Sequence, residues 1–180
     1  MPSNKKKSKV DILIDLIDEG DEEEAMRFLA GSPEVAREMS TREGVLAGAT
    51  PLHWAGHRDH IRLCKLLVEL GADPNSASAR WWRTPLSWAA DAGCVDAVAC
   101  LLDAGAEIDA DAFGNATAMH AVAQGGSTSG KGDPKAYRRT VETLIKAGAD
   151  INRVASGDGG QTPLGDAVRN ENAAVADVLR

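Results

Sequence analysis

The chain has 180 residues, of which 43% are apolar and 26% are charged, and these proportions fit a soluble globular protein and exclude collagen-like and broadly disordered classes. Four lysines lie within the first nine residues, so the rest of the chain holds 16 basic and 27 acidic side chains, a net charge of -11, against -7 for the whole sequence. Because such a body repels phosphate backbones, we expect no nucleic-acid partner.

Residues 1–9 are predicted to form a basic disordered tail, since their lysines precede any apolar pattern. No apolar run of about 18 residues follows, so no membrane span is expected, and the tail lacks the apolar stretch and cleavage site of a secretory signal. Cys64, Cys94 and Cys100 are irregularly spaced, which favours a reducing compartment. These features predict a cytoplasmic protein.

Residues 10–49 are predicted to form a helical pair. The apolar stretch 11–17 supplies its first helix, Gly20 its turn, and Phe28 and Leu29 belong to its second helix. The acidic run from Asp18 to Glu24 suits the polar outer face of an N-terminal cap.

Similar segments then begin at Thr50, Thr84, Thr117 and Thr162, with starts 34, 33 and 45 residues apart. Three of these starts are followed by a pair of large aliphatic residues and then Gly-Ala-Asp or Gly-Ala-Glu, at a distance from Thr to Gly of 21, 21 and 31 residues. The third unit therefore holds an insertion of 10 residues, between Gln124 and Lys135. Self-similarity at this period predicts a stacked array.

The residue types predict a helical hairpin in each unit. Threonine before proline begins a helix, because its hydroxyl caps an unpaired N–H while proline at the first helical position loses nothing. Apolar residues recur three and four positions apart in the second helix. Gly71, Gly105 and Gly148 end these second helices, where the chain takes a left-handed conformation.

The Thr-Pro-Leu-His start, the paired leucines, Gly-Ala-Asp and the period of 33 residues resemble ankyrin repeats. The resemblance covers about residues 11 to 180 and implies an all-α solenoid of about five stacked helix-turn-helix units joined by β-turn fingers. We therefore predict a single domain over residues 10–180. Its units are the degenerate cap 10–49, the repeats 50–83, 84–116 and 117–161, with a Gly-rich insertion at 124–135, and an incomplete unit 162–180.

Two departures from the family pattern concern the finger tips and the last unit. The family places glycine two residues before the threonine; Gly48 and Gly160 obey, whereas Trp82 and Asn115 do not. Asparagine tolerates a left-handed backbone, but an indole forces another finger conformation. In the last unit the closing glycine would fall beyond Arg180, so this unit is either a trimmed capping helix or part of a longer chain.

The strongest candidate for partner binding is the finger Arg80-Trp81-Trp82-Arg83. The resemblance implies that partners bind the concave face formed by fingers and first helices, and Trp and Arg dominate protein interfaces. The alternative is that one indole folds back on a neighbouring hairpin. The same mapping places further candidates on or near this face: His57, Arg58, Asp91, Ala92, Asp111 and Phe113. Trp54 and Trp88, at equivalent positions, are predicted to pack between adjacent first helices.

Two patterns point weakly to other chemistry. His53, His57 and His60 have spacing that could suit a metal. The resemblance to ankyrin repeats implies instead that His53 and His120 hold the family's structural position, where the imidazole hydrogen-bonds the turn backbone. The stretch from Gly125 to Lys131 matches a phosphate-binding loop, yet Gly132 replaces the expected hydroxyl residue and the required strand is missing. We therefore expect neither a metal nor a nucleotide cofactor and read the stretch as an insertion, which can still contribute to recognition.

No catalytic frame is present, so we predict a monomeric, non-enzymatic module that binds another protein through its concave face. The alternatives are a regulatory or inhibitory segment of a larger polypeptide or enzyme complex and, more remotely, a nucleotide-binding enzyme that uses the Gly-rich insertion. Cys94 takes the place of a turn histidine and is the thiol whose reactivity we would test.

Overall fold

The computed structural model describes residues 7–43, 47–78, 83–111, 116–125, 133–156 and 160–180. Within these ranges the chain forms helices and no strand, and no helix is both long and apolar enough to cross a membrane. The helices are α1 (Lys9–Glu19), α2 (Glu22–Gly31), the short 3-10 helix η1 (Pro33–Arg37), α3 (Pro51–His57), α4 (Ile61–Glu69), α5 (Pro85–Asp91), α6 (Val95–Asp103), α7 (Ala118–Gln124), α8 (Pro134–Lys146), α9 (Pro163–Arg169) and α10 (Ala173–Leu179).

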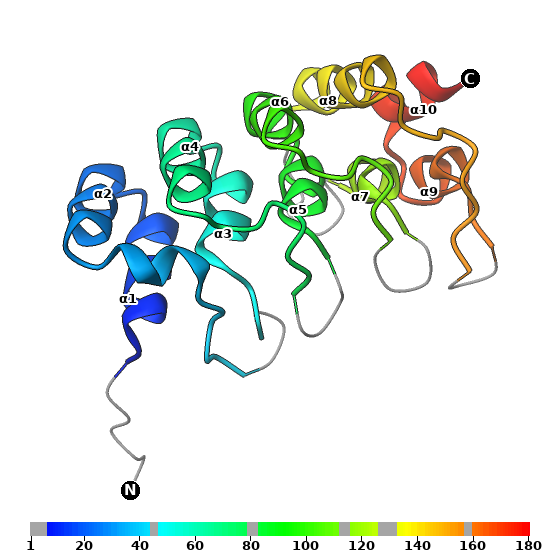
Figure 1. The fold of residues 1–180 in the computed structure, drawn as a ribbon. Helices are drawn as coiled ribbons and strands as arrows, with labels where there is room; N and C mark the ends of the chain where they lie inside the picture. The colour runs from blue at the N-terminus through cyan, green and yellow to red at the C-terminus, as the bar shows by residue number, and fades with distance from the viewer. Residues whose placement is uncertain (1–6, 44–46, 79–82, 112–115, 126–132, 157–159) are drawn as a thin grey trace, which may run out of the picture.

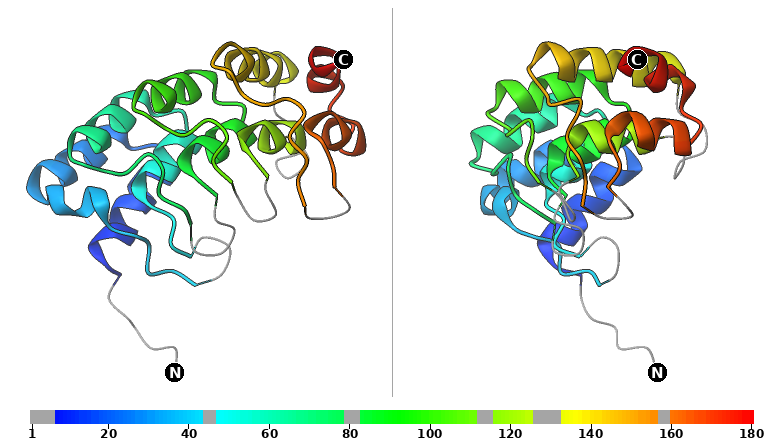
Figure 2. Two further views of the ribbon diagram at one scale, coloured as in Figure 1. Left: turned by 45° about the vertical axis from the view of Figure 1, so that its right-hand side comes forward. Right: turned by 90° about the vertical axis from the view of Figure 1, so that its right-hand side faces the viewer.

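The helices form five antiparallel pairs that stack side by side, which confirms the predicted ankyrin-repeat solenoid (Figure 1). Inner helices α1, α3, α5, α7 and α9 make one layer, outer helices α2, α4, α6, α8 and α10 the other, and the fingers extend from the inner layer along the inside of the curve (Figures 1 and 2). One boundary differs from its prediction. Lys9, assigned to the tail, is the first residue of α1, because Ser8 caps the helix by accepting from the Asp11 N–H.

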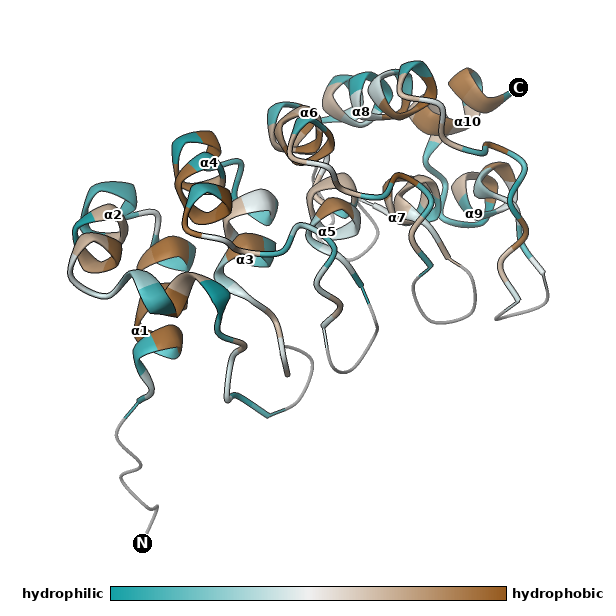
Figure 3. Ribbon diagram, viewed as in Figure 1, coloured by the Kyte–Doolittle hydropathy of each residue, from teal (hydrophilic) through white to brown (hydrophobic). Residues whose placement is uncertain are grey.

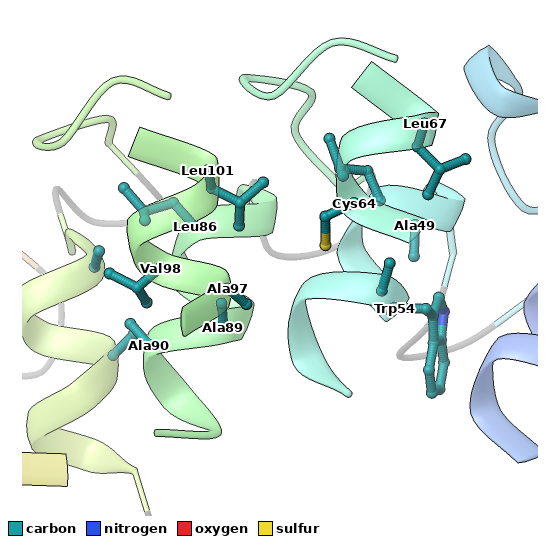
Figure 4. Packing of buried hydrophobic residues seen from close by; sticks show 14 of the residues in the cluster. Ala49, Trp54, Cys64, Leu67, Leu86, Ala89, Ala90, Ala97, Val98 and Leu101 are labelled. Atoms are coloured by element: carbon teal, nitrogen blue, oxygen red, sulfur yellow. The ribbon is translucent and has the colours of Figure 1, made fainter. Parts of the chain in front are cut away.

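Apolar side chains lie between hairpins and not around one centre. The brown, hydrophobic sides of the helices in Figure 3 turn toward neighbouring helices. Figure 4 shows this packing for residues including Leu67 of α4 and Leu86 and Leu101 of the next pair, all of which are buried. Small residues permit the close approach: a Cβ on Gly56 would lie 3.6 Å from the Ala89 Cβ. Each hairpin therefore depends on its neighbours for burial.

The predicted threonine is the N-cap of each inner helix after α1. In α3, the Thr50 N–H donates to His53 Nδ1 at 3.1 Å, and His53 Nε2 lies 2.9 Å from the Arg83 carbonyl oxygen of the next finger. Because Nδ1 accepts, the hydrogen resides on Nε2 and is donated to that carbonyl. His120 repeats both contacts in α7, with Thr117 and Gln161. This confirms the structural role predicted for the two histidines, whose link to the following finger we call the histidine latch.

The histidine latch is missing from α5, where Ser87 occupies the corresponding position. Its hydroxyl donates to the Thr84 carbonyl of its own helix and does not reach the next finger. We expect Ser87→His to restore the latch and raise the free energy of unfolding by about 1 kcal/mol, the net value of one hydrogen bond. Urea unfolding measures the change. Ser87→Ala is the control, and a Ser87→His variant no more stable than this control would contradict the prediction.

A second set of links joins the start of an outer helix to the end of the inner helix in the previous unit. Backbone carbonyls at a helix end lack partners within the helix. His60 Nε2 lies 3.3 Å from the Ile17 carbonyl oxygen, and Cys94 Sγ donates to that of His57 at 3.3 Å. Asn172 donates to the Val122 carbonyl oxygen at 3.3 Å. We call these residues, with Tyr137, the turn donors.

Tyr137 is the turn donor of the fourth unit, although it belongs to α8. Its hydroxyl donates to the Asp91 carbonyl oxygen at 3.3 Å, and its ring packs against Gly93. The position matching the other turn donors falls in the Gly-rich insertion, and residues 126–132 lie outside the described residues. The insertion follows helix α7, so its context is not the strand that a phosphate-binding loop requires.

Burial makes Cys94 a poor nucleophile. Burial raises the pKa of its thiol to about 12, so almost no reactive thiolate exists at neutral pH. We expect Ellman's reagent to label Cys94 slowly in the folded protein and rapidly in protein unfolded in urea. The Cys64→Ser/Cys100→Ser variant has Cys94 as its remaining thiol, so its labelling rate reports on this residue alone. Equal rates in the two states would overturn this expectation.

Candidate partner-binding face

One position recurs at or next to the end of each inner helix, so stacking of the hairpins sets these equivalent residues in a line. The inner helices themselves form the layer on the inside of the curve (Figure 1). We call this line the inner row: Asp18, His57, Asp91, Gln124 and Arg169. All of these side chains are exposed or partly exposed, whereas residues immediately before them, such as Ala90 and Ala123, are buried against the next hairpin. In the first four units the inner row is thus more accessible than the residue before it, whereas Val168 of the last unit, which no further hairpin covers, is itself exposed.

The finger predicted as the main contact surface is only partly described. Arg80, Trp81 and Trp82 lie outside the described residues, as does Phe113. Arg83 is described: its carbonyl accepts from His53, and its Nη1 lies 3.7 Å from Asp91 Oδ1. Arg83 and Asp91 are therefore brought together at the base of this finger.

Aromatic rings lie beside this pair. The Trp54 and Trp88 ring centroids are 5.7 Å apart at an interplanar angle of 71°, so the predicted packing of these residues is confirmed as an edge-to-face contact. His57 completes the group, with its ring 6.0 Å from that of Trp88. Trp54 is buried, but Trp88 is partly exposed. The sequence pattern predicted only packing for Trp88, although its spacing of three from Asp91 places both residues on one helix face.

Burial governs the electrostatics of Asp91, whose side chain is 14% exposed. Burial raises the pKa of this carboxyl group above its ordinary value, while the nearby Arg83 and His57 lower it without cancelling the effect. Removal of charge from water is the physical cause. Asp91 is consequently the inner-row carboxylate that is most in need of a positive partner.

Two other predicted residues are held in ion pairs away from this centre. Arg58 Nε donates to Asp18 Oδ1 at 3.0 Å, linking the second unit to the first. Asp111 pairs with Arg153 across adjacent fingers. Ala92 is partly exposed at the end of α5. Part of the acidic run predicted to form the polar outer face of the first unit is engaged in a contact with the second unit, because Glu23 accepts a hydrogen bond from Arg62 of α4 at 2.7 Å.

The three histidines that suggested a metal have separate partners. His53 forms its latch, His57 Nδ1 lies 3.5 Å from the Trp88 carbonyl oxygen, and His60 faces Ile17. Within the described ranges, no three His, Cys, Asp or Glu residues are grouped so that they could hold a metal ion.

Comparison with known proteins agrees with this architecture. A family model for ankyrin repeats (3 copies) matches residues 10–112, which include the degenerate first unit. The human ankyrin repeat and SOCS box protein 16 is 33% identical over 132 residues, 73% of this chain and 28% of the relative. The Drosophila melanogaster transient receptor potential channel pyrexia is 34% identical over 58% of this chain and 10% of its own length.

The mouse B-cell lymphoma 3 protein homolog is 32% identical over 57% of this chain and 21% of its own length. This chain thus spans less than a third of each of these relatives. Residues 113–180 fall outside the family match, but the described part of this range forms two further hairpins of the same kind, α7 with α8 and α9 with α10. The repeat motifs, the stacked hairpins and the family match establish that the chain belongs to the ankyrin-repeat family.

Proposed function

We propose that this protein binds a partner protein through the inner row and the adjoining fingers. Ankyrin repeats are protein–protein interaction modules, and the finer assignment is supported by one observation: the inner-row residues His57 and Asp91 lie beside the partly exposed indole of Trp88 and the guanidinium of Arg83. Trp and Arg supply most of the binding energy in protein interfaces. No catalytic role is needed to account for this arrangement.

The mechanism is presentation on a rigid frame. Histidine latches fix the base of two fingers, and turn donors fix the ends of inner helices, so the inner-row residues are positioned before a partner arrives. Less conformational entropy is then lost on binding than if a mobile loop had to be ordered.

Photo-crosslinking identifies the partner. A benzophenone amino acid at position 57 should capture the partner, whereas the same group at Lys65, exposed on outer helix α4, should not. The partner identified by mass spectrometry is then purified. We expect His57→Ala/Arg169→Ala to weaken its binding at least ~10-fold, and the matched outer-face variant Lys65→Ala/Lys135→Ala to change it less than about twofold. Equal losses for the two variants, or a loss for the outer-face variant alone, would refute the proposed face.

A second candidate function is supported by the length of the relatives, of which this chain spans less than a third. In this proposal the array is the recognition or regulatory segment of a larger polypeptide. An antibody against the array would reveal a native protein much longer than 180 residues; a native protein of this length would contradict it. Fractionation with the same antibody tests the cytoplasmic location, which stays a prediction.

A further inference from the structure

Asp91 has an incomplete set of partners. Its side chain is largely buried, yet its carboxylate accepts no hydrogen bond from any group in the described part of the chain. Its charged neighbour Arg83 stands 3.7 Å away, beyond hydrogen-bond distance. A buried carboxylate normally accepts hydrogen bonds from several donors, because its desolvation is otherwise uncompensated.

The first unit shows what the missing donor would be. Asp18, at the same inner-row position, accepts from both Nε and Nη2 of Arg58, which directly follows the inner-row residue of the next unit. The position equivalent to Arg58 opposite Asp91 is Gly125. A Cβ at Gly125 would lie 2.5 Å from the Asp91 carbonyl oxygen and 2.7 Å from Tyr137 Cε1. The backbone and Tyr137 therefore prevent a side chain at position 125 from taking the role of Arg58.

Aromatic surface adjoins the Asp91 carboxylate. Trp88 lies one helical turn before Asp91 on α5 and is partly exposed, and the His57 ring packs edge-on against it. Indole and carboxylate together suit a guanidinium group, which stacks on an aromatic ring and donates two parallel hydrogen bonds to a carboxylate. A lysine ammonium group forms the ion pair but lacks the planar match.

We propose that Asp91 and Trp88 receive an arginine side chain of the partner protein, which reproduces in trans the contact that Arg58 makes with Asp18. This inference rests on the proposed function and names the chemistry of the partner segment at the centre of the inner row. Arg83 then acts as a weak internal competitor that keeps the free carboxylate partly neutralised until the partner arrives.

The test uses three acetylated and amidated pentapeptides, Gly-Gly-X-Gly-Gly, in which X is arginine, lysine or citrulline. Citrulline has nearly the shape of arginine without its charge. Nitrogen-15 NMR follows the Trp88 indole N–H signal, assigned by its loss in Trp88→Phe. We expect saturable shifts with the arginine peptide and at least ~5-fold weaker binding of the other two peptides.

Variants separate binding from mere structural support. Asp91→Asn should abolish the preference for arginine, whereas Asp96→Asn, at an exposed position of α6, should keep it. Arg83→Gln removes the competitor and should tighten binding of the arginine peptide about twofold or more, an effect opposite to that of general damage. This variant also tests the proposal should Asp91→Asn fail to fold by circular dichroism.

The proposal would be overturned if the citrulline or the lysine peptide bound as tightly as the arginine peptide. It would also be overturned if the preference for arginine survived in Asp91→Asn. Weaker arginine binding by folded Arg83→Gln would overturn it as well. The proposed function has its own criterion, because the purified partner can lose affinity for His57→Ala/Arg169→Ala while the peptides show no selectivity. That combination would leave the binding face standing and remove the arginine site alone.

Discussion

Replacement of His53 by alanine is expected to lower the free energy of unfolding by about 3 kcal/mol, as measured by urea denaturation at pH 7. The ring is fully buried, so its removal leaves a cavity. It also leaves the Thr50 N–H and the Arg83 carbonyl without their partner, and unsatisfied buried groups add to the cost. Lys65→Ala on the exposed face of α4 is the control, with an expected change below about 0.5 kcal/mol.

The same residue predicts a pH dependence. Burial lowers the pKa of His53 from 6.5 to about 4, against a smaller opposing effect of the Arg83 carbonyl. Between these values the unfolded chain binds the proton and the folded chain does not, so stability falls as the pH decreases from 6.5 toward 4, by at most about 3 kcal/mol. His53→Gln should show a flatter profile over this range. Parallel profiles for the two proteins would show that His53 is not the titrating group.

Replacement of Asp11 by alanine is expected to cost about 3 kcal/mol. This buried carboxylate accepts hydrogen bonds from three hydroxyl groups, those of Ser40 at 2.6 Å, Thr41 at 2.5 Å and Ser8 at 2.7 Å. Arg42 of the same finger adds its charge. Hydrogen bonds to a charged acceptor are among the strongest in proteins, and the alanine variant leaves the donors unpaired.

The pH profile gives the sign of this contribution. Burial alone would raise the pKa of Asp11, but the hydrogen bonds from Ser40, Thr41 and Ser8 and the charge of Arg42 outweigh burial and hold it below 3.8. The stabilisation is therefore complete above that value and is lost as the pH falls through the lower folded-state pKa. The stability difference between the native protein and Asp11→Ala should shrink below about pH 4. The control Asp177→Ala, which removes an exposed ion pair, should leave the free energy of unfolding nearly unchanged both above and below about pH 4.

The sequence predicted the features that repeat. Thr50, His53 and the closing glycines have the same chemistry in several units, so their roles followed from helix capping and backbone geometry, and Gly71 has the expected left-handed φ of 88°. The packing of Trp54 against Trp88 followed from their equal phase. These predictions needed only neighbours within a unit or one period away.

What the sequence could not predict depends on particular side chains that meet across the chain. Asp11 is paired with residues about 30 positions away in the degenerate unit, where no motif marks the contact. Tyr137 donates its hydrogen bond from a helix that begins later in the repeat because of the insertion, so the repeat period did not predict this turn donor. The lack of an arginine at position 125, opposite Asp91, agrees with the space that Tyr137 occupies there, a steric fact that only coordinates reveal.

The turn donors have a consequence for how this array can change. A histidine, a cysteine, a tyrosine and an asparagine perform the same task, and what they share is a hydrogen that can be donated to a waiting carbonyl. Since Tyr137 donates from within α8, this link needs no donor from the loop ahead of that helix. Changes in the length or composition of that loop would therefore spare this hydrogen bond, and loops are where binding specificity commonly changes.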